Sequence, residues 1–228
     1  HRDGSEVFTE IALAQKGQRE RIATIRVDEE RQSFVANGNE VKVIYADAPD
    51  KIDYTQYGID NAIIIDNTGA WRDEAGLSQH LKSKGASKVI LTAPGKGSLK
   101  NIVAGINSDQ IEPTDAIISA ASCTTNAIAP PLKAMDDEFG IVTGHVETVH
   151  AYTNDQNLTD NFHKKPRRGR SAPINMVLTS TGAASAAAKA IPSLKGKLTA
   201  NAVRVPIPNV SLAIMSLTLS RATTVEEV

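Results

Sequence analysis

Apolar and polar positions in the first half of the chain predict a strand, a helix and a second strand. Residues 59–66 form a short continuous apolar run, which is typical of a parallel strand buried on both faces. Residues 73–85 carry apolar side chains at helical spacing and end at a glycine. Residues 88–93 predict the second strand, which a Pro-Gly pair closes. This order predicts a βαβ unit with a right-handed crossover.

Shorter runs predict additional strands in the same half. Residues 23–27 and 41–46 are rich in β-branched side chains, and the turn-forming pair Asn37-Gly38 lies between them. Residues 116–120 form another apolar run. We therefore expect an α/β fold that begins with a partial Rossmann-like domain built on a parallel sheet.

The pattern changes in the second half of the chain. Strand-like runs cover residues 145–152, 201–205 and 211–220, and an alanine-rich segment at 182–191 predicts a helix. These elements favour an α+β domain with a mostly antiparallel sheet. We expect the boundary between the two domains near Ala121.

Length and composition narrow the class of protein. The chain has 228 residues, 25 basic and 26 acidic side chains and a net charge of −1, which argues against a protein dedicated to nucleic acids or membrane surfaces. Four Phe, four Tyr and one Trp offer few platforms for base stacking. No apolar stretch approaches the ~18 residues of a membrane span. A single cysteine forms no internal disulfide, so we expect a soluble protein in a reducing, cytoplasmic compartment, with no metal site.

Cys123 is the first candidate for chemistry. A free cysteine is more often a small buried apolar residue. Here it follows an apolar strand and precedes residues 124–139, which predict a helix, and a thiol at a helix N-terminus is favoured as the reactive thiolate. Pro130 and Pro131 predict a kink in this helix or a late start.

His150 is the second candidate, although a lone histidine in a strand is usually a structural or surface residue. As a base it could pair with the thiolate. The basic segment 163–170 is the third candidate, and its ordinary role is a solvated loop. Arginines bond two phosphate oxygens at once, so a small phosphorylated substrate is the sharper hypothesis. Hydroxyls and helix-start amides at 122–124 and 179–182 are natural anion ligands.

Several short segments together form a highly specific pattern, in which Ser-Cys-Thr-Thr-Asn at 122–126 is followed by Thr-Val-His at 148–150. On these residues the chain resembles the phosphorylating glyceraldehyde-3-phosphate dehydrogenase family. The resemblance begins near Asn61, with a thinner match over residues 41–49. The segments that carry it are 66–69, 91–94, 121–126, 148–156, 167–170, 179–184, 194–198 and 204–210.

The resemblance implies a thioester mechanism. Cys123 is expected to add to the aldehyde, and His150 to activate the thiol and accept the proton as hydride leaves for NAD or NADP. Inorganic phosphate then attacks the thioester to give an acyl phosphate. The residues expected to bind the phosphate of glyceraldehyde-3-phosphate are Thr153, Asp155 and Arg204. Those expected to bind the attacking phosphate are Ser122, Thr124, Arg168, Thr181 and Gly182.

The resemblance also places cofactor contacts at Thr68, Gly69, Thr92 and Asn154. Residues 1–121 are expected to form a partial dinucleotide-binding domain that lacks the family's glycine-loop βαβ unit, since no G-x-G-x-x-G occurs here. Residues 122–228 are expected to form a catalytic domain that lacks its C-terminal part. Thr224 and Glu227 form a capping box, which predicts the start of a helix at the end of the chain.

Departures from the family pattern bear on the cofactor. Asp47 stands where many members carry arginine at the adenine, and Asn161-Phe162 stands where members that prefer NAD often carry Leu-Pro. The choice between NAD and NADP is therefore open, and we expect this chain to bind a dinucleotide poorly.

Competing functions remain at this point. Within the same class, the substrate could be erythrose-4-phosphate, because the anion sites would look alike. In a different class, the chain could be a truncated, catalytically silent paralogue that acts through protein contacts. RNA binding through the basic loop ranks lowest for the reasons of charge and aromatic content. The resemblance implies a homo-oligomer, a tetramer formed through the sheet half and the basic loop.

Overall fold

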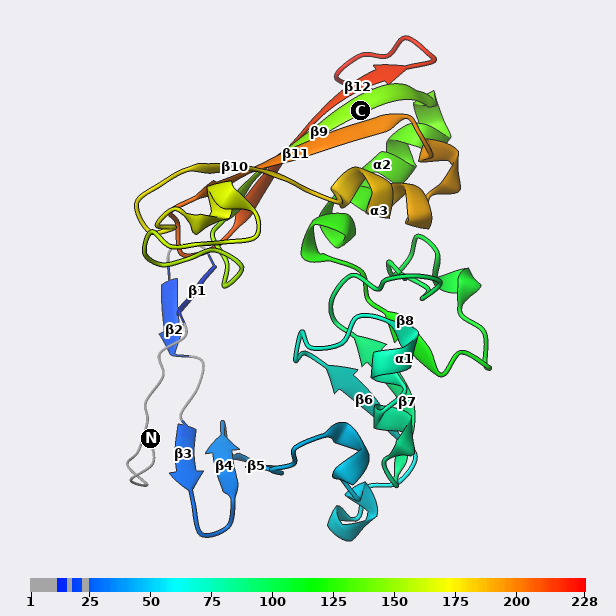
Figure 1. Cartoon of the computed structure of the whole chain (residues 1–228). Coiled ribbons are helices and arrows are strands. Elements are labelled where there is room, and N and C mark those ends of the chain that lie inside the picture. The colour runs from blue at the N-terminus through cyan, green and yellow to red at the C-terminus, as the bar shows by residue number, and fades with distance from the viewer. Residues whose placement is uncertain (1–11, 16–17, 22–24) are drawn as a thin grey trace.

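The computed structural model describes residues 12–15, 18–21 and 25–228, whose strands form separate sheets (Figure 1). β1 (Ala12–Gln15) and β2 (Gln18–Arg21) pair antiparallel. β3 (Ile25–Asp28), β4 (Ser33–Ala36) and β5 (Asn39–Lys42) form an antiparallel meander.

The turn of this meander confirms the prediction from Asn37-Gly38. Both residues have positive φ angles, 51° and 82°, as a two-residue hairpin turn of type I′ requires. Of the two strands predicted beside it, 23–27 corresponds to β3, and its first two residues lie outside the described part. The other, 41–46, ends early at Lys42, because Lys42 pairs with Ser33, the first residue of β4, and no strand partner continues beyond it.

The predicted parallel sheet is confirmed. β6 (Ala62–Asp66), β7 (Ala86–Leu91) and β8 (Ile117–Ser119) lie in the order β6-β7-β8 and all pair parallel. Their carboxyl ends therefore meet at one edge of the sheet, where Thr68 and Thr92 follow β6 and β7.

Two details of this sheet differ from the predictions. The strand at 59–66 is not buried on both faces, because Ile63 and Ile65 are 55% and 59% exposed. The helix predicted over 73–85 is short: α1 (Glu74–Leu77) is followed by a separate 3₁₀ turn at His80–Lys82. Gly76 contributes to this, since glycine is a poor helix former and a Cβ here would lie 2.5 Å from Cδ1 of Trp71.

The second half contains the larger core. α2 (Cys123–Phe139) and α3 (Ala183–Ala190) pack together on a four-stranded sheet of β9 (Ile141–Ala151), β10 (Val177–Ser180), β11 (Leu198–Val205) and β12 (Ser211–Leu219) (Figure 1). The strand order is β10-β11-β9-β12. Only the central pair β11 and β9 is parallel, which confirms a mostly antiparallel sheet.

α2 begins at Cys123 and runs through Pro130 and Pro131 as one helix, so a late start is wrong. The side chain of Ser122 fixes this start, because its Oγ accepts a hydrogen bond from the Thr125 amide at 3.0 Å. At the other end of the chain, the Glu227 carboxylate accepts a hydrogen bond from the Thr224 amide at 3.0 Å, which forms half of the predicted capping box.

No helix in the described ranges is long and apolar enough to cross a membrane.

Candidate active site

The backbone before α2 is strained where it delivers the cysteine. Ala121 is buried and has a φ of 59°, in the left-handed region that non-glycine residues rarely adopt. Its amide donates to Oγ of Ser119 at 3.0 Å, which helps to hold this conformation. The chain then turns at Ser122, so that Cys123 becomes the first residue of α2 and its thiol is exposed. The thiol thus lies beside the unpaired amides of a helix start.

His150 lies near the end of the central strand β9, and its Nε2 is 3.8 Å from Sγ of Cys123. The other ring nitrogen, Nδ1, is 2.7 Å from the carbonyl oxygen of Ala151. Nδ1 also lies 3.4 Å from NH1 of Arg204, so this nitrogen faces one acceptor and one donor. When Nδ1 carries the proton, the lone pair of Nε2 faces the thiol, which is the arrangement a general base needs.

Arg204 lies beside His150 because β11 pairs parallel with β9 in a register that matches these two residues. Its NH1 donates to the carbonyl oxygen of Ala151 and to Oγ1 of Thr153, each at 3.2 Å. Its Nε is buried and has no hydrogen-bond partner. Burial lowers the pKa of the Arg204 guanidinium, and the positive charge of Arg168 lowers it further. Arg204 is therefore a cation whose charge the protein leaves poorly compensated.

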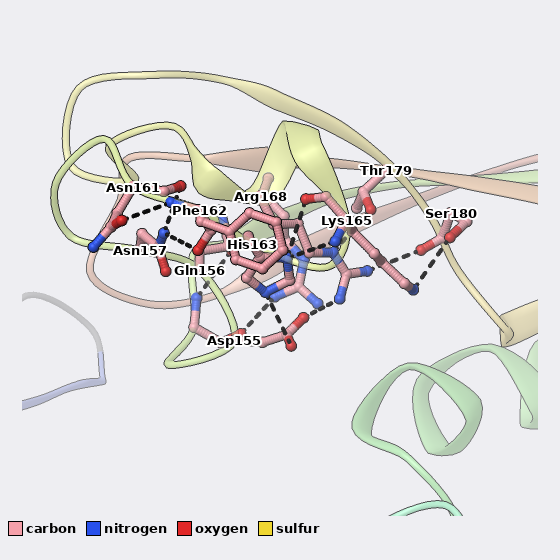
Figure 2. A network of polar contacts seen from close by, with 12 residues as sticks. Asp155, Gln156, Asn157, Asn161, Phe162, His163, Lys165, Arg168, Thr179 and Ser180 are labelled. Atoms are coloured by element: carbon pink, nitrogen blue, oxygen red, sulfur yellow. Dashed lines mark hydrogen bonds and ion pairs between the residues drawn. The ribbon is translucent and has the colours of Figure 1, made fainter.

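Arg168 is held by protein groups on each of its nitrogens (Figure 2). Nε donates to Oγ1 of Thr179 at 2.9 Å, and NH2 donates to the carbonyl oxygen of Ser180 at 3.2 Å. NH1 forms an ion pair with the carboxylate of Asp155, whose other oxygen lies 4.0 Å from Nε2 of His163. This network joins the basic loop to β10.

These groups surround a cavity of about 410 Å³. It joins the start of α2, the end of β9, the basic loop and the segment that leads from β10 into α3. Three cationic side chains line it, and none of the carboxylates in the described part of the chain does. The lining residues are Pro94, Ser122, Cys123, Thr124, Thr148, His150, Lys165, Arg168, Ser180, Thr181, Gly182, Ala183, Ala186, Ala202 and Arg204.

The structure gathers most of the predicted site residues here. Those that line the cavity are Ser122, Cys123, Thr124, His150, Arg168, Thr181, Gly182 and Arg204. Thr153 and Asp155 do not line it but bond to its two arginines. Asn154 lies in the exposed turn between them.

The other predicted cofactor contacts lie at the carboxyl edge of the parallel sheet. Oγ1 of Thr68 donates to the Asp66 carboxylate at 2.7 Å, and Oγ1 of Thr92 lies 2.6 Å from Oδ1 of Asn67. Gly69 has a φ of 72°, which glycine adopts without strain. Pro94, two residues after Thr92, lines the cavity that holds Cys123. The predicted cofactor contacts thus lie at one edge of the sheet, and the sequence supplies no glycine loop for a pyrophosphate.

Other lining residues were not singled out from the sequence. Lys165 belongs to the basic segment, but nothing in the pattern separates it from its neighbours. Thr148 is buried two positions before His150, on the same face of β9, and strand alternation could have identified it once the facing of His150 was known. Within the part of the chain that the structure describes, no group of three His, Cys, Asp or Glu residues is placed to hold a metal ion.

Comparisons with known proteins identify relatives of this chain. Residues 122–228 match the family described as glyceraldehyde 3-phosphate dehydrogenase, C-terminal domain. A glyceraldehyde-3-phosphate dehydrogenase-like protein from Pseudomonas aeruginosa (strain UCBPP-PA14) is 68% identical over 205 residues, which cover 90% of this chain and 44% of that protein.

Two further relatives are more distant. The chloroplastic glyceraldehyde-3-phosphate dehydrogenase A of Zea mays is 45% identical over 192 residues, 84% of this chain and 47% of the relative. The glyceraldehyde-3-phosphate dehydrogenase of Clostridium pasteurianum is 43% identical over 198 residues, 86% of this chain and 58% of the relative. The chain thus spans about half the length of the curated relatives that it matches.

Proposed function

The chain belongs to the glyceraldehyde-3-phosphate dehydrogenase family, and we propose that its cavity carries out the phosphorylating oxidation of glyceraldehyde-3-phosphate, a glycolytic oxidoreductase reaction. The observation that supports this most directly is the 3.8 Å approach of the Cys123 thiol to Nε2 of His150 in a cavity lined by cations. We propose residues 1–121 as the partial cofactor-binding domain and residues 122–228 as the catalytic domain.

In the first step His150 takes the thiol proton at Nε2, and Sγ of Cys123 adds to the aldehyde carbon. The His150 imidazolium returns this proton to the former carbonyl oxygen, which gives a thiohemiacetal and restores the neutral ring. The first amides of α2 would stabilise the negative charge that develops on this oxygen during the addition. The Ala151 carbonyl, 2.7 Å from Nδ1, favours the tautomer that this step uses.

A bound nicotinamide dinucleotide, NAD or NADP, supplies the hydride acceptor that converts the thiohemiacetal to a thioester. Thr68, Gly69, Thr92 and Asn154 are the residues that would hold it. His150 accepts the hydroxyl proton that the thiohemiacetal loses in this oxidation, so one base serves both proton transfers.

Two anion sites flank the cysteine in this proposal. Arg204 and Thr153 bind the phosphate of the substrate, and Asp155 acts on this region through its ion pair with Arg168. Ser122, Thr124, Thr181, Gly182 and Arg168 border the site of the attacking phosphate. An oxygen of that phosphate attacks the thioester carbon, the C–S bond breaks, and the products are an acyl phosphate and the free Cys123 thiolate.

The direct test measures formation of the reduced nicotinamide in the presence of glyceraldehyde-3-phosphate, NAD or NADP, and phosphate or arsenate. We expect Cys123→Ser to abolish turnover, and His150→Asn to lower it by about 10²–10⁴-fold because a general base is lost. His150→Asn should also slow the alkylation of Cys123 by iodoacetamide.

His145→Asn is the matched control, since His145 lies on the same strand but does not line the cavity. Absence of turnover in a folded protein would contradict the proposal and favour the catalytically silent paralogue. Faster turnover of erythrose-4-phosphate would reassign the substrate. Tetramer formation and a cytoplasmic location stay predictions, which sedimentation and fractionation test.

A further inference from the structure

We propose that Lys165 is the cation that binds the attacking phosphate, and that Arg168 mainly holds in place the residues that border that site. This inference rests on the proposed function and assigns a binding residue that the resemblance does not include. The positive charges in the cavity differ in how far protein groups already pair with them.

Arg168 is largely committed to the protein. Its three nitrogens donate to Thr179, to the Ser180 carbonyl and to Asp155, and the Asp155 carboxylate cancels its charge at close range. A guanidinium offers five N–H groups, so Arg168 still has donors left. Asp155 compensates the charge of Arg168, and three partners fix the plane of its guanidinium. Arg168 therefore orients an incoming anion more than it attracts it.

Lys165 is in the opposite situation. Across the described residues, no carboxylate lies within the 4.0 Å ion-pair distance of its Nζ. Its only hydrogen-bond partner there is a neutral one, Oγ of Ser180 at 3.5 Å. Figure 2 shows this side chain reaching from the basic loop toward Ser180, alongside the guanidinium of Arg168. Ser180 directly precedes Thr181 and Gly182, so the ammonium lies next to the predicted ligands of the attacking phosphate.

The charges then match the two anions of the reaction. The cavity is lined by three cations and no carboxylate, and the Asp155 ion pair uses one of them. Arg204 remains for the substrate phosphate, beside Thr153, and Lys165 remains for inorganic phosphate, beside Ser180. Without Lys165, the second anion would meet hydroxyls, amides and an arginine that is already paired with a carboxylate.

The test measures protection of Cys123 from iodoacetamide by inorganic phosphate, in the full chain and without substrate or cofactor. Loss of one charge-assisted hydrogen bond corresponds to about a 10-fold change in affinity. We therefore expect Lys165→Gln to raise the half-protecting phosphate concentration about 10-fold. Lys165→Arg keeps the charge and should keep the protection. Lys164→Gln removes a neighbouring charge outside the cavity and should leave the protection unchanged.

A second reagent checks the charge directly. Iodoacetate is an anion of nearly the same size as iodoacetamide. The rate of alkylation by iodoacetate divided by the rate with iodoacetamide therefore reports the local electrostatic potential at Cys123. Lys165→Gln should lower this ratio, and Lys164→Gln should not. Equal effects of the two glutamine variants would show a general surface charge and overturn the assignment.

Unchanged protection in Lys165→Gln would place the protecting phosphate at Arg204 and would also overturn it. Neither measurement needs turnover, so an inactive protein that keeps the Lys165 effect contradicts the proposed function and supports this inference. If the protein turns over, Lys165→Gln should raise KM for phosphate about 10-fold and leave KM for the aldehyde unchanged.

Discussion

The two sheet regions of this chain differ in how firmly they hold their functional residues. The four-stranded sheet packs with α2 and α3 into a core of twelve buried residues, from which Cys123, His150 and Arg204 project. The parallel sheet has a buried core of only four residues, Leu77, Val89, Leu91 and Leu99.

The proposed nucleophile and the proposed cofactor contacts are therefore supported by separate hydrophobic cores. Cys123 is fixed by a capped helix of 17 residues, whereas Thr68 and Thr92 depend on the ends of two short strands and on Asp66. The reactivity of Cys123 should therefore resist damage to the parallel sheet. Three predictions test this separation.

The largest effect is expected from truncating a buried side chain in each core in turn. Leu132→Ala in α2 and Leu77→Ala in α1 both truncate fully buried side chains, and each should lower the free energy of unfolding by about 2–5 kcal/mol. Only Leu132→Ala should change the alkylation rate of Cys123 under native conditions, because Leu132 supports the helix that carries the thiol. Urea unfolding and iodoacetamide labelling measure the two quantities. An equal change in labelling for both variants would mean that the cores are coupled.

A smaller effect is expected from Asp66→Asn, which probes the parallel sheet alone. Burial tends to raise the pKa of the Asp66 carboxyl, but hydrogen bonds from Thr68 and His80 outweigh it and lower the pKa below its ordinary value of 3.8. The substitution should lower the free energy of unfolding by about 1–3 kcal/mol at neutral pH.

The sign of the pH dependence follows from that lowered pKa. The fold prefers the ionised carboxylate, so its contribution is complete above 3.8 and is lost as the pH falls below 3.8 through the folded-state value. The difference between wild type and Asp66→Asn in urea unfolding should therefore shrink on acidification below 3.8. A difference that does not depend on pH would show that the Asp66 charge is irrelevant to the sheet.

The smallest effect is expected from the two helix caps. Ser122→Ala and Asp73→Ala each remove a side chain that accepts a backbone amide, at 3.0 Å from Thr125 and 2.8 Å from Gly76. Each should cost about 1 kcal/mol in thermal or urea unfolding. Ser122→Ala should also slow the labelling of Cys123, since the start of α2 loses its anchor. If Asp73→Ala slows it equally, the site extends further into the first region than we propose.

Much of the fold could be predicted from local patterns. The strands at 88–93 and 211–220 and the helix at 182–191 are confirmed as β7, β12 and α3 within a few residues. The errors arise where contacts with residues distant in the sequence determine the local structure. An apolar run cannot show whether both sheet faces are covered, and Ile63 and Ile65 prove exposed. The approach of Trp71 to Gly76, which accompanies the short α1, is likewise a tertiary contact.

The site residues also divide into those that the sequence predicts and those that tertiary contacts determine. Cys123 could be proposed because it lies between an apolar strand and a predicted helix, and His150 because its motif lies at a specific spacing from that of Cys123. Which cations are paired with carboxylates could not be predicted, because the pairing of Arg168 with Asp155 depends on how the basic loop folds back. Lys165 lines the cavity and the neighbouring Lys164 does not, and this difference depends on the same fold of the loop.

The central place of β9 also sets the order in which the site is assembled as the chain folds. Cys123 and His150 are 27 residues apart along the chain, whereas Arg204 and His150 are 54 apart. Doubling the closed loop costs about 0.6 kcal/mol more in chain entropy, and β11 must reach β9 in parallel, a slow type of pairing. We therefore expect Cys123 to meet His150 before Arg204 joins them.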